Sequence, residues 1–283
     1  MLVSSRELLL AAQEGSYAVG AFNTNNLEIT HAIFRAAEAT RAPILVQLSA
    51  GAIKYGGIDY LPEIVKTHAR LADIPAAIHL DHGPDFETAM RCLRYGFTSV
   101  MRDASKLPFE ENVAETRRVV EAAHAVEVPV EAELGRIVGA EEHVVVSEAE
   151  KAMTDPDEAA RFVEESGCDF LAVSIGNAHG FYKGEPDLDF DRLRAIRQQV
   201  QVPLVLHGAS GIPDDQIREA VSQGICKINI DTEIRDAFAR SVRQTLAEKP
   251  DEIDPRKILG PAIDAMQAVV ERKIVLFGSG GKA

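Results

Sequence analysis

The 283-residue sequence has few cysteines, no excess of positive charge and no long apolar run. The three cysteines, Cys92, Cys168 and Cys226, are an odd number without metal-like pairing, so we expect buried thiols in a reducing compartment. The 30 Lys and Arg residues against 44 Asp and Glu give a formal net charge of −14. Nucleic-acid-binding surfaces need a positive excess, so nucleic acid is excluded as the main partner. A small anion is not excluded, because it feels only the local field.

No segment has the pattern of a membrane span or an export signal. The apolar runs fall short of the roughly 18 residues that suggest a span. The N-terminus lacks a basic segment followed by a long apolar stretch. We therefore expect a cytoplasmic protein without membrane contact. At about 150 residues per domain, the length fits either two domains or one large barrel.

Eight apolar segments of strand length alternate with amphipathic segments. The apolar segments are rich in Val, Ile, Leu and Ala, as in parallel strands buried on both faces. Strands are predicted at 18–22, 43–48, 75–80, 97–101, 129–134, 169–175, 202–206 and 225–230. Helices are predicted at 28–40, 59–72, 86–95, 109–126, 156–166, 188–200, 214–223 and 233–247. One strand and helix recur about every 30 residues, the size of a βα unit.

Eight such units predict an α/β fold, a (β/α)8 or TIM barrel, in a single domain over 1–283. The barrel would occupy about 17–247, and a C-terminal helical extension about 250–283. A doubly wound open sheet is the main alternative, weakened because no G-x-G-x-x-G follows the first strand. The Gly-Ser-Gly-Gly segment at 278–281 is expected to fray.

Polar residues follow every predicted strand, at the end where barrels of this type hold their active sites. His82, His179 and His207 follow the third, sixth and seventh strands, so they can converge over the barrel mouth. Three imidazoles with an open fourth position form a typical catalytic zinc site. The alternative is three independent histidines on the rim. His79 lies on the same strand face as Asp81, and we expect it to contact the site residues without binding the metal itself.

Three carboxylates lie near these histidines in the predicted fold. Asp81 directly precedes His82, and could either move a proton at the reacting centre or orient a histidine. The residue types leave both roles open. Asp103 and Glu133 end neighbouring strands, where they could support the histidines or form an alternative metal position.

A phosphate site is predicted after the last two strands. Small residues at 208–211 let backbone N–H groups approach an anion, and a helix start follows at Pro213. The segment 229–232 ends the eighth strand at the usual phosphate position of such barrels. Gly180 and Lys183 add a loop with a cation. Metal and phosphate sites at one mouth suggest a phosphorylated hydroxy-ketone substrate, and either carbon–carbon bond cleavage or isomerisation.

At these residues the sequence resembles the zinc-dependent class II ketose-bisphosphate aldolases, such as fructose-bisphosphate aldolase, from Leu2 to the C-terminus. The motifs are AFNTNN at 21–26, HLDHG at 79–83, EAELG at 131–135, AHG at 178–180, HGASG at 207–211 and KINIDTE at 227–233. The resemblance implies cleavage of fructose 1,6-bisphosphate to dihydroxyacetone phosphate and glyceraldehyde 3-phosphate, with His82, His179 and His207 holding catalytic Zn2+. Asp81 would exchange the C4 hydroxyl proton, and Glu141 a proton at C3.

The resemblance also implies the binding residues. Asp103 and Glu133 would form a second or resting metal position, and a monovalent cation (Na+ or K+) would bind near Gly180 and Gly208. Arg256 would reach a neighbouring subunit's site, which implies a homodimer or homotetramer. The substrate would contact Asn23, Ser49, Gly180, Lys183, Gly208, Ala209, Ser210, Asn229, Ile230, Asp231, Thr232 and Arg256.

Two positions depart from the family pattern, and three alternatives stay open. Val138 replaces a glycine in the loop that carries Glu141, which suggests a stiffer loop, and Arg102 replaces a residue that is more often apolar. One alternative is a tagatose 1,6-bisphosphate aldolase, which differs by the orientation of one substrate hydroxyl. Another is a Schiff-base aldolase, for which Lys227 is the candidate amine. The third is a non-catalytic phosphosugar-binding barrel.

Overall fold

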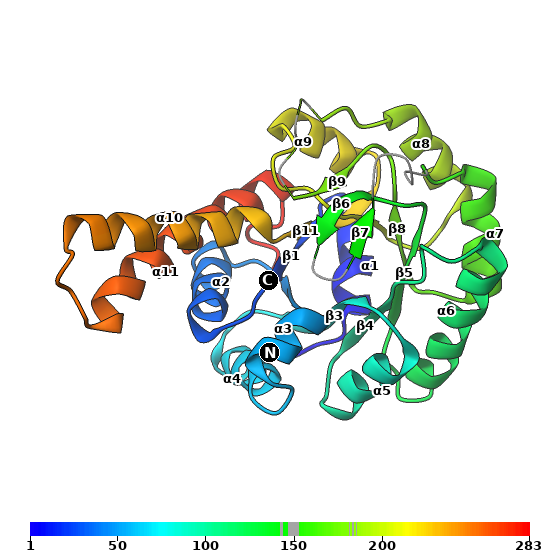
Figure 1. Cartoon of the computed structure of the whole chain (residues 1–283). Helices are drawn as coiled ribbons and strands as arrows, with labels where there is room; N and C mark the ends of the chain where they lie inside the picture. Colours follow the sequence, from blue (N-terminus) through cyan, green and yellow to red (C-terminus); the bar gives the residue numbers. More distant parts are fainter. Residues whose placement is uncertain (142–143, 147–152, 181, 183, 185) are drawn as a thin grey trace.

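The computed structural model describes every residue except 142–143, 147–152, 181, 183 and 185. Eight parallel strands close into a barrel, in the order β1-β11-β10-β8-β5-β4-β3-β2 (Figure 1). The strands are β1 (Val19–Asn23), β2 (Ile44–Ser49), β3 (Ala76–Gly83), β4 (Ser99–Arg102), β5 (Val130–Leu134), β8 (Phe170–Val173), β10 (Leu204–Leu206) and β11 (Ile225–Ile230). Each lies in, or within three residues of, a predicted strand, so the (β/α)8 prediction is confirmed.

The predicted helices are also present, and two further helices accompany them. The eight predicted ones are α2 (Leu27–Thr40), α4 (Leu61–Leu71), α5 (Phe86–Arg94), α6 (Phe109–His124), α7 (Pro156–Ser166), α8 (Phe190–Gln199), α9 (Asp214–Ser222) and α10 (Thr232–Glu248). The C-terminal extension holds α11 (Pro255–Phe277). The sequence did not predict α1 (Ser5–Gly15) or α3 (Ala50–Gly56). In the described residues, no helix is long and apolar enough to cross a membrane.

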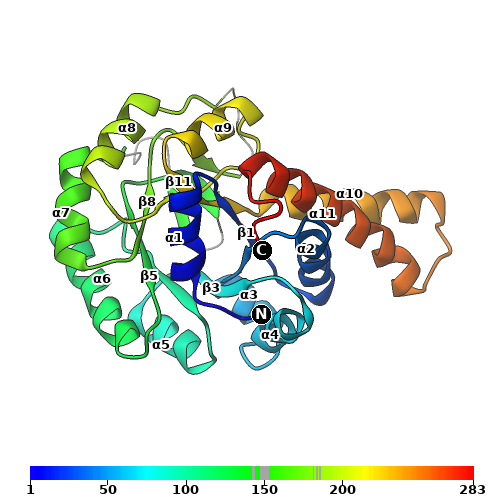
Figure 2. The same cartoon turned by 180° about the vertical axis from the view of Figure 1, so that it is seen from behind.

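Helix α1 packs across the end of the barrel opposite the predicted mouth (Figure 2). It begins at Ser4, whose hydroxyl accepts a hydrogen bond from the Arg6 amide and so satisfies one free amide of the first turn. Its Leu8, Leu9 and Ala12 are buried against the apolar side chains inside this end of the barrel. The barrel is thereby closed on one side, and its active groups can face solvent only on the other.

The barrel interior changes from apolar to polar along the strands. Side chains alternate across each strand, so every second residue lines the barrel axis. Leu45 and Ala77 belong to the apolar layer, and Gln47 and His79, two residues further along, are buried and polar. Glu131 and Lys227 are also fully buried. Buried charges need partners, so this layer is expected to form a connected network beneath the mouth.

Helices α10 and α11 form an antiparallel pair that projects from the barrel, here called the arm (Figures 1 and 2). Helix α11 packs on α2, where Arg35 Nη1 lies 3.0 Å from Asp264 Oδ1. The chain end then docks on the end of α2: the Gly281 amide donates to the Thr40 carbonyl at 2.9 Å, and Ser279 is buried. The expected fraying of 278–281 is therefore wrong, because these backbone groups cap a neighbouring helix.

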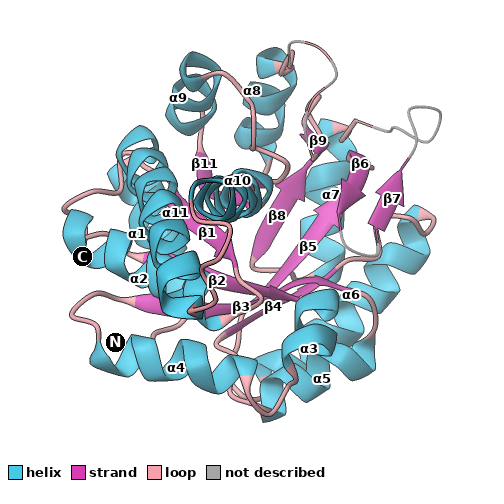
Figure 3. Ribbon diagram, turned by 60° about the vertical axis from the view of Figure 1, so that its left-hand side comes forward, coloured by secondary structure: helices cyan, strands magenta, loops and turns pink. Residues whose placement is uncertain are grey.

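A small second sheet lies beside the carboxyl ends of β5 and β8 (Figure 3). It contains β6 (Val138–Glu141), β7 (Val144–Val146) and β9 (Ala178–His179). Strand β6 runs parallel to β9, with Gly139 opposite His179. Val138 begins this strand, and β-branched residues are favoured in strands. The loop that carries Glu141 thus runs next to the strand that carries His179.

Candidate metal centre and active site

A β-bulge presents Asp81 and His82 together at the barrel mouth. Strand β3 pairs with β4 in regular register up to Leu80, and the register then shifts so that Gly83 faces Arg102. Asp81 and His82 therefore lie opposite the single residue Met101, and His82 adopts a positive φ of 46°. A bulge re-aims side chains in this way. Gly83 is required here, because a Cβ would lie 2.1 Å from the Met101 carbonyl oxygen.

The structure brings His82, His179 and His207 together. All three are buried, and one ring nitrogen of each lies within 4.8 Å of the others. Nε2 of His82 and Nδ1 of His207 are 3.0 Å apart. Two nitrogens bound to one tetrahedral zinc, each at about 2.0–2.1 Å, would lie only slightly further apart. The three imidazoles therefore form a donor set that fits a zinc ion, and two of their nitrogens already lie close to the separation that it needs.

Two carboxylates fix the orientation of two of these rings. Nδ1 of His82 donates to Asp103 Oδ2, and Nε2 of His207 donates to Glu131 Oε1, both at 2.8 Å. An ionised carboxylate only accepts, so the proton sits on these nitrogens and the other nitrogen of each ring faces the centre. Burial alone would raise the pKa of Asp103, but the hydrogen bonds from His82 and Ser105 lower it overall. Burial would likewise raise the pKa of Glu131, but Lys227 and His207 lower it.

Glu133 has a buried carboxylate oxygen that a bound cation would satisfy. Its Oε2 atom is buried and accepts no hydrogen bond from any described residue. This atom lies 3.7 Å from Nδ1 of His207, and with His82 and Asp103 the carboxylate forms a second potential metal cluster. Burial and the neighbouring Asp103 charge raise the pKa of Glu133 well above its usual value. An unsatisfied buried carboxylate oxygen is costly, so the donor set fits a bound metal ion.

Asp81 is held by two amides rather than by a histidine. Its Oδ2 accepts from Asn23 Nδ2 at 2.7 Å, and its Oδ1 accepts from Asn229 Nδ2 at 3.2 Å. Gln47 donates to Asn23 Oδ1 and Lys227 donates to Asn229 Oδ1, so each amide presents its NH2 group to Asp81. His82 and His207 are oriented by other carboxylates, which favours proton transfer over histidine orientation as the role of Asp81.

Lys227 is fully buried inside the barrel and paired. Its Nζ lies 2.9 Å from Glu131 Oε2 and 2.8 Å from Asn229 Oδ1. A Schiff base needs an amine nitrogen that is free to attack a carbonyl, whereas Lys227 Nζ is held between the Glu131 carboxylate and the Asn229 amide oxygen. The structure therefore disfavours the Schiff-base alternative. His79 faces the same carboxylate at 3.6 Å, and burial together with the Lys227 charge lowers its pKa well below the usual value.

The loops predicted to bind phosphate meet beside His179. Gly208 has a φ of 61°, and a Cβ there would lie 2.3 Å from the Ala178 carbonyl oxygen. The Tyr182 hydroxyl accepts from the Ala178 amide at 2.8 Å and donates to the Gly208 carbonyl at 2.9 Å, so it joins the two loops. Five of the predicted phosphate-site residues are buried: Ala209, Ser210, Asn229, Ile230 and Asp231. Gly180 and Thr232 are partly exposed, and Lys183 lies outside the described residues.

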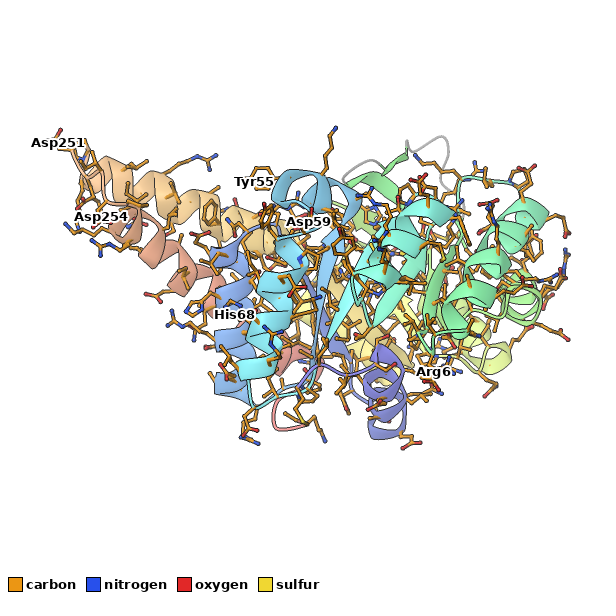
Figure 4. All side chains as sticks on the ribbon, turned by 90° about the horizontal axis from the view of Figure 1, so that it is seen from below. Arg6, Tyr55, Asp59, His68, Asp251 and Asp254 are labelled. Atoms are coloured by element: carbon orange, nitrogen blue, oxygen red, sulfur yellow. The ribbon has the colours of Figure 1, made fainter. Side chains whose placement is uncertain are left out.

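Three further predicted site residues occupy different surroundings. Ser49 is buried opposite Asp81 on the neighbouring strand, and its hydroxyl accepts from the Ala52 amide at the start of α3. Glu141 ends β6, and its side chain is outside the described part. Arg256 pairs with Asp254, which lies at the far end of the arm from the barrel (Figure 4). Arg256 is therefore not brought to the mouth of its own barrel.

Comparison with known proteins identifies the family. The model of the class-II fructose-bisphosphate aldolase family matches residues 3–282. The chain belongs to this family. Fructose-bisphosphate aldolase of Thermus caldophilus is 50% identical over 306 residues and covers both chains fully. That of Geobacillus stearothermophilus is 50% identical, covering 100% of this chain and 99% of its own. The crystal structure of the YdjI aldolase from Escherichia coli K12 matches with a TM-score of 0.89 and 38% identity over the full length of both chains.

As a class II aldolase the chain is a lyase that makes and breaks a carbon–carbon bond, and the predicted resemblance is confirmed. Sequence reasoning did not assign a role to Glu131, Gln47 or Tyr182. The signal for Glu131 was present: it lies two residues before Glu133 and so shares the inward face of the strand. Tyr182 gave no such signal, because its contacts depend on how two loops fold.

Proposed function

We propose that this class II aldolase cleaves fructose 1,6-bisphosphate to dihydroxyacetone phosphate and glyceraldehyde 3-phosphate, and forms it in the reverse direction. The observation that carries the proposal is the buried triad of His82, His179 and His207, together with the buried Asp81 that directly precedes His82 in the same bulge. The relatives named fructose-bisphosphate aldolase support the choice of substrate. The proposed location is the cytoplasm, where the three unpaired cysteines would stay reduced.

The three histidines would hold Zn2+, which when bound supplies Lewis-acid polarisation of the substrate carbonyl. Asp103 and Glu131 hold the rings of His82 and His207 in the orientation that such an ion requires. Asp103 and Glu133, together with His82, provide an alternative metal position. A monovalent cation, Na+ or K+, would bind backbone carbonyls near Gly180 and Gly208.

Asp81 performs the proton transfer at C4. In cleavage it takes the proton of the C4 hydroxyl, the C4–O bond becomes a carbonyl, and the electron pair of the C3–C4 bond remains on C3. In condensation Asp81 returns this proton to the aldehyde oxygen. Glu141 would deliver and remove the proton at C3. The hydrogen bonds from Asn23 and Asn229 hold Asp81 in place for this step.

The substrate phosphates are bound at two ends. The dihydroxyacetone-phosphate end would be held by Lys183 and by backbone and side-chain groups of Gly180, Gly208, Ala209, Ser210, Asn229, Ile230, Asp231 and Thr232. Asn23 and Ser49 would contact the sugar. Arg256 lies at the end of the arm, and would bind the far phosphate in a neighbouring subunit of a homodimer or homotetramer.

Metal analysis combined with an aldol-cleavage assay tests this function. We expect about one zinc per histidine triad, cleavage that a chelator abolishes and zinc restores, and a higher kcat/KM for fructose than for tagatose 1,6-bisphosphate. His179→Ala should lose both zinc and cleavage. His124→Ala, on the exposed end of α6, is the matched control and should keep both. A higher kcat/KM for tagatose 1,6-bisphosphate would overturn the proposed substrate assignment. Inactivity of the zinc-loaded protein would favour a non-catalytic phosphosugar-binding barrel.

A further inference from the structure

Arg102 is a buried arginine next to the residues of the proposed metal centre. It ends β4 and lies opposite Gly83 in the strand pairing, one residue after the bulge that carries His82. Only 5% of the residue is exposed. An arginine is almost never buried to this extent unless it is paired; here Nη1 and Nη2 have partners, whereas Nε has none among the described residues.

The Arg102 guanidinium joins three segments of the chain. Nη1 donates to the Asp103 carbonyl and, at 3.5 Å, to the Gly83 carbonyl. Nη2 donates to Glu115 Oε2 on α6 at 3.1 Å. The planar guanidinium can hold several acceptors at once in a fixed geometry. The loop after β4 and the end of β3 are thereby tied to a helix on the outside of the barrel.

Both tied segments determine the position of His82. Asp103 holds the His82 ring through the 2.8 Å hydrogen bond to Nδ1, and Gly83 directly follows His82 in the chain. The Asp103 carboxylate is itself fixed by the Ser105 amide at 3.1 Å and the Ser105 hydroxyl at 2.7 Å. His82 has a φ of 46°, a strained conformation for a residue other than glycine. This bulge therefore tends to relax unless its neighbours hold it.

We propose that Arg102 is a positioning residue that holds His82 in its metal-binding orientation and thereby slows the loss of the metal ion. This inference rests on the proposed zinc site. It assigns a role that Arg102 performs through Asp103 and Gly83, without contact to the substrate. The role differs from general stabilisation, because two of the three acceptors belong to Gly83, which follows His82 in the chain, and to Asp103, which holds the His82 ring.

The test is the rate at which the zinc-loaded enzyme releases zinc to an excess of a coloured chelator. Arg102→Met removes the donors but keeps an apolar side chain of similar length. Arg102→Lys keeps the charge without the planar group. Arg197→Met is the matched control: Arg197 also donates to two backbone carbonyls, those of Val200 and Val202, but at the opposite end of the barrel. Unfolding of the zinc-free proteins in urea measures general stability in parallel.

We expect Arg102→Met to release zinc about tenfold faster, as for other residues that support metal ligands, with Arg102→Lys between it and the wild type. Arg197→Met should release zinc at the wild-type rate even if it unfolds more easily. Equal rates for Arg102→Met and the wild type would overturn the proposal. So would equal acceleration in both Met variants, since this would indicate general destabilisation.

If Arg102→Met does not fold, Arg102→Lys and Glu115→Ala provide the same measurement. Glu115→Ala removes one acceptor and should accelerate release to a smaller extent, whereas an unchanged rate in both variants would overturn the proposal. Failure of the proposed zinc site itself would look different. In that case His179→Ala would bind as much zinc as the wild type, and no variant would show release from the triad.

Discussion

Glu131 contacts three titratable side chains inside the barrel, those of His207, Lys227 and His79. Glu131→Gln would leave the Lys227 ammonium buried without a counter-charge, which typically costs about 3–5 kcal/mol. It would also replace the charged acceptor of the His207 ring by a neutral amide oxygen, and supporting carboxylates of this kind change metal affinity about 10–100-fold. We therefore expect both the free energy of unfolding and the zinc affinity to fall. Urea unfolding without zinc and competition with a chelator measure the two effects separately.

The double variant Glu131→Gln with Lys227→Met distinguishes the effect of the Glu131–Lys227 ion pair on stability from the effect of Glu131 on zinc affinity. It removes both buried charges, so most of the lost stability should return. The zinc affinity should stay low, because His207 still lacks its carboxylate. A double variant as unstable as Glu131→Gln alone would contradict the ion-pair explanation.

The reactivity of the three cysteine thiols measures how well single buried residues are protected from solvent. Cys92, Cys168 and Cys226 are each at most 3% exposed. Burial raises the pKa of Cys92 and Cys168 to about 12 and that of Cys226 to about 11. Because the thiolate is the reactive form, none should react with a thiol reagent at pH 8 until the protein unfolds, and all three should react in denaturant. Rapid reaction of one thiol in the native protein would show that its surroundings open.

At the scale of elements, the barrel strands were predicted more reliably than the short helices and the small second sheet. Each barrel strand is buried along its whole length, and its Val, Ile, Leu and Ala residues are visible without knowledge of its neighbours. Helix α1 was missed although Ser4, Glu7 and a run of leucines mark its start, and α3 is only seven residues long. The pairing of β6 with β9 could not be predicted, since it depends on two loops from different parts of the chain.

The same limit applies to the site. The three histidines and Asp81 could be located from sequence because each follows a strand, and all strand ends meet at one mouth. The contacts of Arg102 with Glu115, and of Lys227 with Glu131, depend on the register between strands and on which helix packs outside them. Neither is set by spacing along the chain.

The β-bulge in β3 is the element that determines the geometry of the metal centre, and Gly83→Ala tests it. The added Cβ would meet the Met101 carbonyl oxygen, a backbone atom that cannot rotate away. We expect a loss of about 1–3 kcal/mol in unfolding free energy, the usual cost of overpacking, together with weaker zinc binding because His82 moves. Gly260→Ala in α11 is the control. It meets nothing within 4 Å, and should stabilise the helix by about 0.5–1 kcal/mol.

At the scale of the whole molecule, the arm has a surface that its own barrel does not use. Ile253, between α10 and α11, is 89% exposed, and the Arg256 side chain is 88% exposed. A projecting helix pair with an exposed apolar residue and a cation at its end is suited to contact with a second subunit. The proposed oligomer would then have sites completed by two chains.

Mixing two inactive variants tests such a shared site. Asp81→Ala lacks the proton-transfer group of its own barrel, and Arg256→Ala lacks the cation proposed for its neighbour's site. In a mixed dimer, the barrel of the Arg256→Ala chain keeps Asp81 and receives Arg256 from the Asp81→Ala chain. Random reassociation makes half of the dimers mixed, each with one complete site, so activity should recover to about a quarter of the wild-type value. If Arg256 acted in its own chain, every site would lack one group, and activity after mixing would stay at the average of the two variants.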